Sequence, residues 1–227
     1  DMEEFLFAEI VDQILDSIAK PQKVAASTTI AGQADFPHAA VVKLAGDPDI
    51  DVARPVLRQS PVLTDEDLTA IAGRASQDHL HAIAERPQLS ETVTDVLVER
   101  GDRKVVHTVS ANHGARFSDS GMSELLAKAR EDVDLRALLV ERPDLSPAAV
   151  AKLLPLVSAN LILRLAERGY DVGASLPPDM LATVSRRLLS ALRERRSNIR
   201  DTATLVEAVR SGELSLDEAR KPAAQTG

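Results

Sequence analysis

The sequence predicts an all-α chain in which helical hairpins repeat about every 28 residues and stack as an α-solenoid, followed by a helical C-terminal extension. Three observations lead to this fold class. A short phrase recurs at a nearly fixed spacing, the segments between its copies carry apolar residues at helical intervals, and no segment alternates as a strand does. The helices predicted below are too short to bury an apolar face alone, so neighbouring repeats are expected to stack.

The recurring phrase ends in a hydroxyl residue, and in most copies a proline and a leucine precede it. Successive hydroxyl residues lie 26, 28 and 28 residues apart, a spacing typical of stacked-repeat proteins. Proline ends one helix and the hydroxyl side chain caps the next, so the phrase separates neighbouring repeats. Its copies are Ser60-Pro61-Val62-Leu63-Thr64, Arg86-Pro87-Gln88-Leu89-Ser90, the degenerate Arg116-Phe117-Ser118, and Arg142-Pro143-Asp144-Leu145-Ser146.

Three helices are expected before the regular repeats. Residues 2–19 carry an amphipathic stripe, residues 22–31 follow Pro21 and end at Gly32, and residues 37–45 end before Gly46. In each repeat a first helix follows the hydroxyl cap, and a second helix follows a short turn. First helices are predicted over residues 65–72, 91–100, 119–130 and 147–154, and second helices over 49–59, 78–86, 103–111, 133–142 and 159–168.

The pattern changes after Gly169, which divides the chain. Residues 1–169 form the predicted repeat domain, and residues 170–178, with Gly173, Pro177 and Pro178, form a linker. Residues 179–220 are predicted to be the helical extension, with helices over 181–196 and 202–210. Residues 221–227 are expected to be a disordered tail.

Composition narrows the classes of function. The net charge of -8 disfavours a large nucleic-acid surface, and an aromatic content of 2% disfavours base-stacking platforms and cofactor pockets. The absence of cysteine excludes disulfides and a cysteine nucleophile. No apolar run is long enough to cross a bilayer and no export signal is visible, so we expect a cytoplasmic protein.

Catalytic and metal-binding motifs are missing. The chain contains no G-x-S-x-G, no phosphate-binding G-x-x-x-x-G-K-[ST] and no G-x-G-x-x-G. The acidic stretch that starts at Asp47 suggests a calcium loop, but Val52 and Arg58 stand where such a loop needs glycine and glutamate. We therefore expect no catalytic residue, metal or cofactor.

Three segments resemble one bacterial family. They are residues 52–68 (VARPVLRQSPVLTDEDL), residues 89–102 (LSETVTDVLVERGD) and residues 111–118 (ANHGARFS). These segments are similar to blocks of domain-of-unknown-function family 2336, common in alphaproteobacteria, and the similarity runs from about Phe5 to Gly169. The resemblance implies a HEAT-like helical repeat domain with no assigned activity, and the family supplies no catalytic residues.

Four histidines fall in adjacent repeats: His79, His81, His107 and His113. His81 and His107 occupy equivalent positions on second helices if the extra residues of the degenerate phrase follow His107. Neighbouring imidazoles of this kind suit a metal site, an enzymatic site or a pH-sensitive patch. The alternative is a set of ordinary, partly exposed histidines, since no HExxH motif or i,i+4 histidine pair is present.

Arginines recur along the predicted second helices. One interpretation is a face that meets an acidic partner segment, and the other is local pairing with Glu85, Glu141 and Glu167 near helix ends. The stretch from Asn112 to Ser118 carries extra residues where the other copies of the phrase have proline, and it lies next to the histidines in the sequence. The candidate interaction surface is therefore Arg54, Arg58, His81, His107, Asn112, His113 and Arg136.

The predicted extension is locally basic. The segment from Leu181 to Arg200 contains six arginines and one glutamate, which suits an anionic partner such as nucleic acid. A solvated helix face or an internal docking site explains the same pattern.

The sequence thus favours a non-enzymatic scaffold that binds a protein or peptide on the concave face of the solenoid. The alternatives are a ligand-binding, metal-binding or enzymatic protein that uses the histidines, and a nucleic-acid-binding protein that uses Arg186 to Arg200. Nucleic-acid binding is disfavoured by the overall charge, and self-association remains open.

Overall fold

A computed structural model describes residues 9–11, 13–15, 17–170 and 172 of the chain. The chain divides into two compact units, Asp1–Val157 and Ser158–Gly227, which are described separately here. The predicted linker, helical extension and tail therefore lie almost entirely outside the described residues, as does much of the first predicted helix.

All regular secondary structure in the described part of the chain is helical, which confirms the predicted all-α class. The single-residue parallel bridge between Leu89 and Ala115 lies outside any strand. The first unit contains α2 (Lys20–Ile30), α3 (His38–Ala45), α4 (Ile50–Gln59), α5 (Asp65–Ala72), α6 (Gln77–Ala84), α7 (Glu91–Arg100), α8 (Arg103–Ala111), α9 (Asp119–Lys128), α10 (Val133–Val140), α11 (Pro147–Leu153) and the 3-10 turn η1 (Leu154–Leu156). The second unit contains α12 (Ala159–Glu167).

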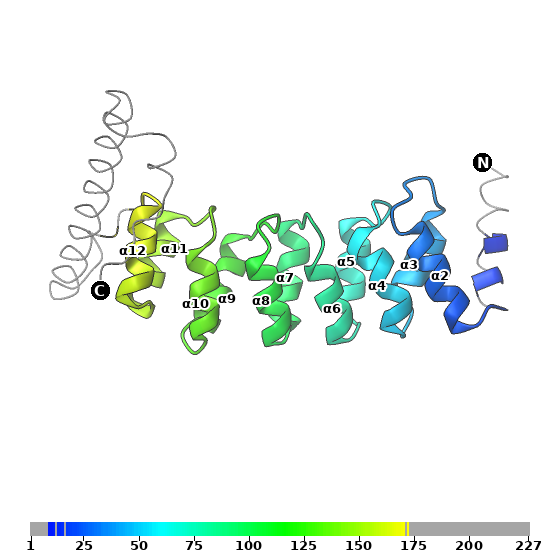
Figure 1. The fold of residues 1–227 in the computed structure, drawn as a ribbon, viewed down its shortest axis with the longest axis horizontal. Helices are drawn as coiled ribbons and strands as arrows, with labels where there is room; N and C mark the ends of the chain where they lie inside the picture. The colour runs from blue at the N-terminus through cyan, green and yellow to red at the C-terminus, as the bar shows by residue number, and fades with distance from the viewer. Residues whose placement is uncertain (1–8, 12, 16, 171, 173–227) are drawn as a thin grey trace, which may run out of the picture. The chain divides into compact units, whose positions relative to one another are not determined.

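The helices of the first unit pack in two layers (Figure 1). One layer, the second-helix layer, is formed by α2, α4, α6, α8 and α10, each packed against the next. The other is formed by α5, α7, α9 and α11 in the same succession. Aliphatic side chains such as Leu57, Leu80, Leu97 and Leu125 fill the space between the layers and have no exposed surface. The helices of the two layers thus bury their apolar stripes against one another.

Hydroxyl and carboxylate caps explain where the helices begin. Thr64 and Asp67 form a reciprocal capping box on α5, with Asp67 N–H donating to Thr64 Oγ1 at 3.2 Å and Thr64 N–H donating to Asp67 Oδ2 at 2.9 Å. Ser118 and Ser146 cap α9 and α11 as predicted. Ser90 holds the N-cap position of α7 as predicted, but its hydroxyl hydrogen-bonds to the Thr92 hydroxyl at 2.9 Å and not to a backbone N–H of the helix.

Three helices of the second-helix layer, α4, α8 and α10, are capped by aspartate. Asp49, Asp102 and Asp132 each accept hydrogen bonds from backbone N–H groups in the first turns of α4, α8 and α10. The carboxylates also lie at the positive end of the helix dipole. The acidic stretch that superficially suggested a calcium loop therefore contains a helix cap.

Candidate interaction surface

In two copies of the repeated phrase, those of Arg86 and Arg142, the arginine bonds to carbonyls of the preceding second helix or the loop after it. Arg86 follows the end of α6 and donates from Nη1 to the Leu57 carbonyl at 2.6 Å and from Nη2 to the Ser60 carbonyl at 2.8 Å. These carbonyls lie at the C-terminal end of α4, where the helix itself supplies no donor. Burial lowers the pKa of the Arg86 guanidinium below its ordinary value.

Arg142 makes the same connection from α10 to α8 and has no exposed surface. Its Nη1 donates to the carbonyls of Ser110 at 3.1 Å and Asn112 at 3.0 Å, and its Nη2 donates to the carbonyl of Ala115 at 2.8 Å. Asp144 receives Nε at 2.8 Å and Nη2 at 2.7 Å, so the buried charge is neutralised. One interpretation of the sequence was that arginines near helix ends pair locally with Glu85, Glu141 and Glu167. That interpretation does not include the contacts seen here, in which the guanidinium groups of Arg86 and Arg142 reach carbonyls of the preceding repeat.

In the repeat with the degenerate phrase, Asn112 stands where the other repeats have Arg86 and Arg142. Its Nδ2 donates to the carbonyls of Ala84 at 3.0 Å and Arg86 at 2.7 Å, at the C-terminal end of α6. Its Oδ1 accepts the Gly114 N–H at 2.9 Å. A Cβ atom at Gly114 would lie 1.9 Å from the Pro87 carbonyl oxygen, so the two loops touch at this point. Asn112 thus donates to carbonyls at the end of the preceding second helix, as Arg86 and Arg142 do, but with a shorter side chain.

The histidine side chains make separate contacts. His79 is buried, with Nε2 donating to the Asp47 carbonyl at 2.9 Å, so that Nδ1 accepts the Ser76 hydroxyl at 2.7 Å. His107 Nε2 lies 2.7 Å from Asp132 Oδ2, and His113 is exposed on the loop after α8. Within the described residues no group of three or more histidine and carboxylate side chains is arranged to hold a metal ion. The predicted histidine cluster is therefore not brought together as one site.

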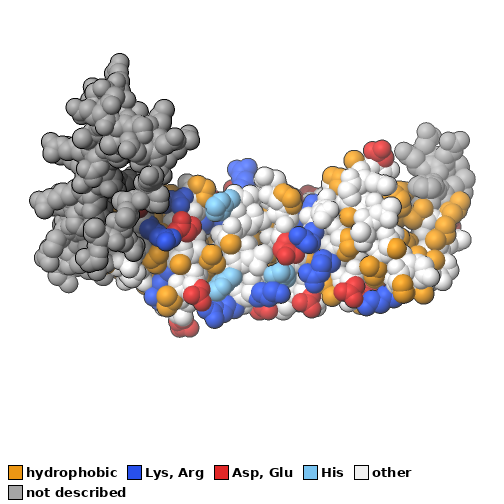
Figure 2. All heavy atoms as spheres, in the orientation of Figure 1, with side chains coloured by type: hydrophobic (Ala, Val, Ile, Leu, Met, Phe, Trp, Pro, Cys, Tyr) orange, Lys and Arg blue, Asp and Glu red, His pale blue; other side chains and the backbone are white. Residues whose placement is uncertain are grey.

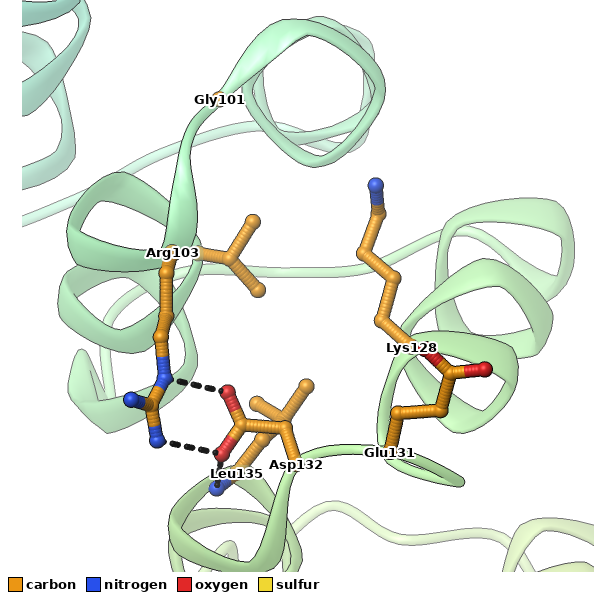
Figure 3. A pocket seen from close by; sticks show the side chains of 7 residues that line it. Gly101, Arg103, Lys128, Glu131, Asp132 and Leu135 are labelled. Carbon is orange, nitrogen blue, oxygen red and sulfur yellow. Dashed lines mark hydrogen bonds and ion pairs between the residues drawn. The ribbon is translucent and has the colours of Figure 1, made fainter.

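An ion-pair network surrounds Asp132 at the N-terminus of α10 (Figure 3). Arg103 on α8 donates to this carboxylate from Nε at 2.8 Å and from Nη2 at 3.1 Å. Arg103, the Leu135 N–H and His107 together hold the pKa of the Asp132 carboxyl well below its usual range. The network forms one wall of a depression of about 460 Å³, and Lys128 on α9 rises from the opposite wall.

A second group of polar side chains spans α4, α6 and α8, and we call it the basic face: Arg54, Arg58, His81, Glu85 and Lys104. Glu85 Oε2 lies 3.2 Å from Arg58 Nε and 4.0 Å from Arg54 Nη1. Basic and histidine side chains gather at the middle of the surface shown in Figure 2. Burial, and then the charge of Lys104, lowers the pKa of His81.

Three polar atoms of the basic face are shielded from solvent and have no hydrogen-bond partner among the described residues: Arg58 Nε, His81 Nδ1 and Glu85 Oε2. The Arg58–Glu85 contact is close enough for an ion pair, but its angles are not those of a hydrogen bond. Next to these atoms lies an open groove of about 480 Å³, whose lining includes Arg58, Glu85, Thr108 and Asn112.

Comparison with known families identifies the chain's relatives. The model of the family described as an uncharacterised protein conserved in bacteria (DUF2336) matches residues 52–223. The chain belongs to this family. The match begins in α4 and extends beyond Gly169, so it starts later and ends later than the similarity seen in the sequence alone. No curated protein and no solved structure matches the chain.

The DUF2336 match covers every residue of the predicted interaction surface, but the structure does not bring all seven of these residues together. Arg54, Arg58 and His81 come together on the basic face, and Asn112 lines the adjoining groove. His107 belongs to the Asp132 network. The remaining two are Arg136, whose Nε donates to the Ala129 carbonyl at 2.6 Å, and the exposed loop residue His113.

Sequence reasoning did not include Glu85 and Lys104 in the surface. Glu85 caps the C-terminus of α6 four residues after His81, a spacing that places both side chains on one face. Lys104 lies in the first turn of α8, three residues before His107. Helical spacing places each residue on a face of its own helix, but it does not show that α4, α6 and α8 bring these faces together. None of the described helices is long and apolar enough to cross a membrane.

Proposed function

We propose that this DUF2336 member is a HEAT-like solenoid that acts as a non-enzymatic scaffold and binds a protein or peptide partner along its second-helix layer. The proposal is supported by the stacking of successive helices in two layers and by the cross-repeat bonds of Arg86, Asn112 and Arg142. Stacked helical pairs of this kind present long surfaces for partners. We place this role in the bacterial cytoplasm, with which the cysteine-free composition is compatible.

One observation carries the binding role. Within the described residues, the shielded His81 Nδ1 has no hydrogen-bond partner, and the shielded Arg58 Nε and Glu85 Oε2 meet only as an ion pair without hydrogen-bond geometry. These atoms lie beside an open groove between α6 and α8. A partner that supplies donors and acceptors there would satisfy groups that the chain leaves incomplete.

The alternative functions have less support. His79 and His107 already have protein partners, so a histidine-based catalytic or metal site would have to break them. Nucleic-acid binding by Arg186 to Arg200 stays a prediction, because that segment lies outside the described residues. The scaffold role therefore accounts for more of the geometry than either alternative.

Site-specific photo-crosslinking in a bacterium that encodes this chain tests the proposal. A photoreactive residue replaces Thr108 in the groove, and a matched variant carries it at Glu99, an exposed position on α7. Discrete protein adducts at Thr108, without the same adducts at Glu99, are the expected result. Equal labelling at both positions, or no protein adduct at Thr108, would refute binding at this groove.

A further inference from the structure

We infer that the segment bound at the basic face is an acidic peptide, whose carboxylates are held by Arg54, Arg58 and Lys104. This inference rests on the proposed scaffold function and names the chemistry of the partner. It follows from the local charge, from the position of Glu85 and from an apolar depression beside Arg54.

The local charge is opposite to that of the whole chain. The basic face places the cations Arg54, Arg58 and Lys104 near the carboxylate of Glu85, whereas the chain carries a net charge of -8. Lys104 of α8 and Arg54 of α4 both lower the pKa of His81 on α6, whereas the carboxylates of Glu85 and Asp102 raise it, so cations from two neighbouring helices act on the same point. A positive patch on an acidic protein selects an acidic partner, because other surfaces of the protein repel it.

Glu85 occupies the place that a partner's carboxylate would take. It lies between Arg54 and Arg58, but at 4.0 Å and 3.2 Å it does not form the paired hydrogen bonds that a guanidinium prefers with a carboxylate. The side chains of Arg54 and Arg58 remain 38% and 43% exposed, so a second carboxylate can reach both. Glu85 therefore acts as an internal competitor that an incoming carboxylate displaces or joins.

The surface next to Arg54 is apolar. Pro21 and Val24 of α2 and Pro55 of α4 line a depression of about 500 Å³, with Arg54 at its edge. Lys20 and Asp51, which also line it, are already paired with each other at 2.9 Å. A peptide that carries an apolar side chain next to its carboxylates can fill this depression while its charges meet the arginines.

Fluorescence anisotropy with two synthetic peptides tests the inference on the full chain. The first is a labelled acidic peptide with several glutamates and one leucine, and the second has glutamine at each glutamate position. We expect the acidic peptide to bind, its affinity to fall as salt rises, and the glutamine peptide to bind at least about tenfold more weakly.

Variants of the basic face give the sharper measurement. Arg54→Ala together with Arg58→Ala should weaken binding of the acidic peptide roughly tenfold, and Glu85→Gln should strengthen it about threefold, since the internal competitor is removed. The matched controls are Arg116→Ala and Glu91→Gln, an exposed pair 3.9 Å apart that lies outside the basic face. These controls make the same kind of charge change and should leave the affinity within about twofold.

Three results would overturn the inference: equal binding of both peptides, weaker binding by Glu85→Gln, or control variants that change the affinity as much as the face variants. The crosslinking at Thr108 is independent of this assay. Protein adducts at Thr108 combined with no binding of the acidic peptide would reject the acidic partner and leave the scaffold function standing.

Discussion

Replacing Arg142 with alanine should destabilise the fold more than replacing any exposed arginine. The side chain is fully buried and donates to the carbonyls of Ser110, Asn112 and Ala115, while Asp144 balances its charge. Hydrogen bonds from a charged donor contribute about 1.5–3 kcal/mol each, but part of this offsets the loss of guanidinium hydration. Removing one partner of such a buried network leaves acceptors unpaired, and the expected loss is about 3–5 kcal/mol.

The loss of stability is measured by urea unfolding at neutral pH, followed by the helical circular dichroism signal. Arg142→Lys should be intermediate, because one ammonium group cannot reproduce the fork that reaches three carbonyls and Asp144. Arg116→Ala is the control, since that side chain is 77% exposed, and it should change stability by less than about 0.5 kcal/mol. If Arg142→Ala costs less than about 1 kcal/mol, the carbonyl bonds do not hold the repeats together as argued.

Four further predictions use the same unfolding assay. Asn112→Ala removes two donors to buried carbonyls and should cost about 1–3 kcal/mol, and a loss within error contradicts its capping role. Gly114→Ala places a Cβ atom 1.9 Å from a backbone oxygen and should cost at least about 1–3 kcal/mol, unlike an alanine substitution at a spacious site. Asp132→Asn keeps the cap but removes the carboxylate whose pKa Arg103 holds below 3.8, so the destabilisation should be full at neutral pH and shrink as pH falls below 3.8, whereas a constant difference refutes it. Burial lowers the pKa of His81 below 6.5, so the unfolded chain takes up the proton first, and His81→Gln should lose less stability than the parent as pH falls through 6.5.

Helix positions were predictable because the sequence marks them locally. The predicted bounds of α5, α7 and α8 agree with the structure, since a cap or a short turn stands at each end. The predicted ends of α6 and α10 were two residues too long, at Arg86 and Arg142. The residue before a proline is disfavoured in the helical conformation, so both arginines leave the helix.

The site was less predictable, because its contacts join residues one repeat apart. Pairing rules for a single helix see partners three or four positions away, whereas Arg58 and Glu85 are 27 positions apart and come from α4 and α6. The same holds for the carbonyls that Arg86 and Arg142 hold, at separations of 26 to 32 residues. An alignment of the repeats with one another, rather than a search for motifs, is the way to find such contacts from sequence.

These contacts explain why some arginines are structural and others are accessible to a partner. After α6 and α10 the arginine before the proline lies outside the helix, and its guanidinium meets the carbonyls left without donors at the end of the preceding second helix. Asn112 meets the same need without a proline, so the feature common to these repeats is a side-chain donor at this point. Arginines used in this way are unavailable to a partner. The guanidinium groups of Arg54 and Arg58 contact Glu85, and both side chains stay 38% and 43% exposed, which is why the proposed binding site is placed there.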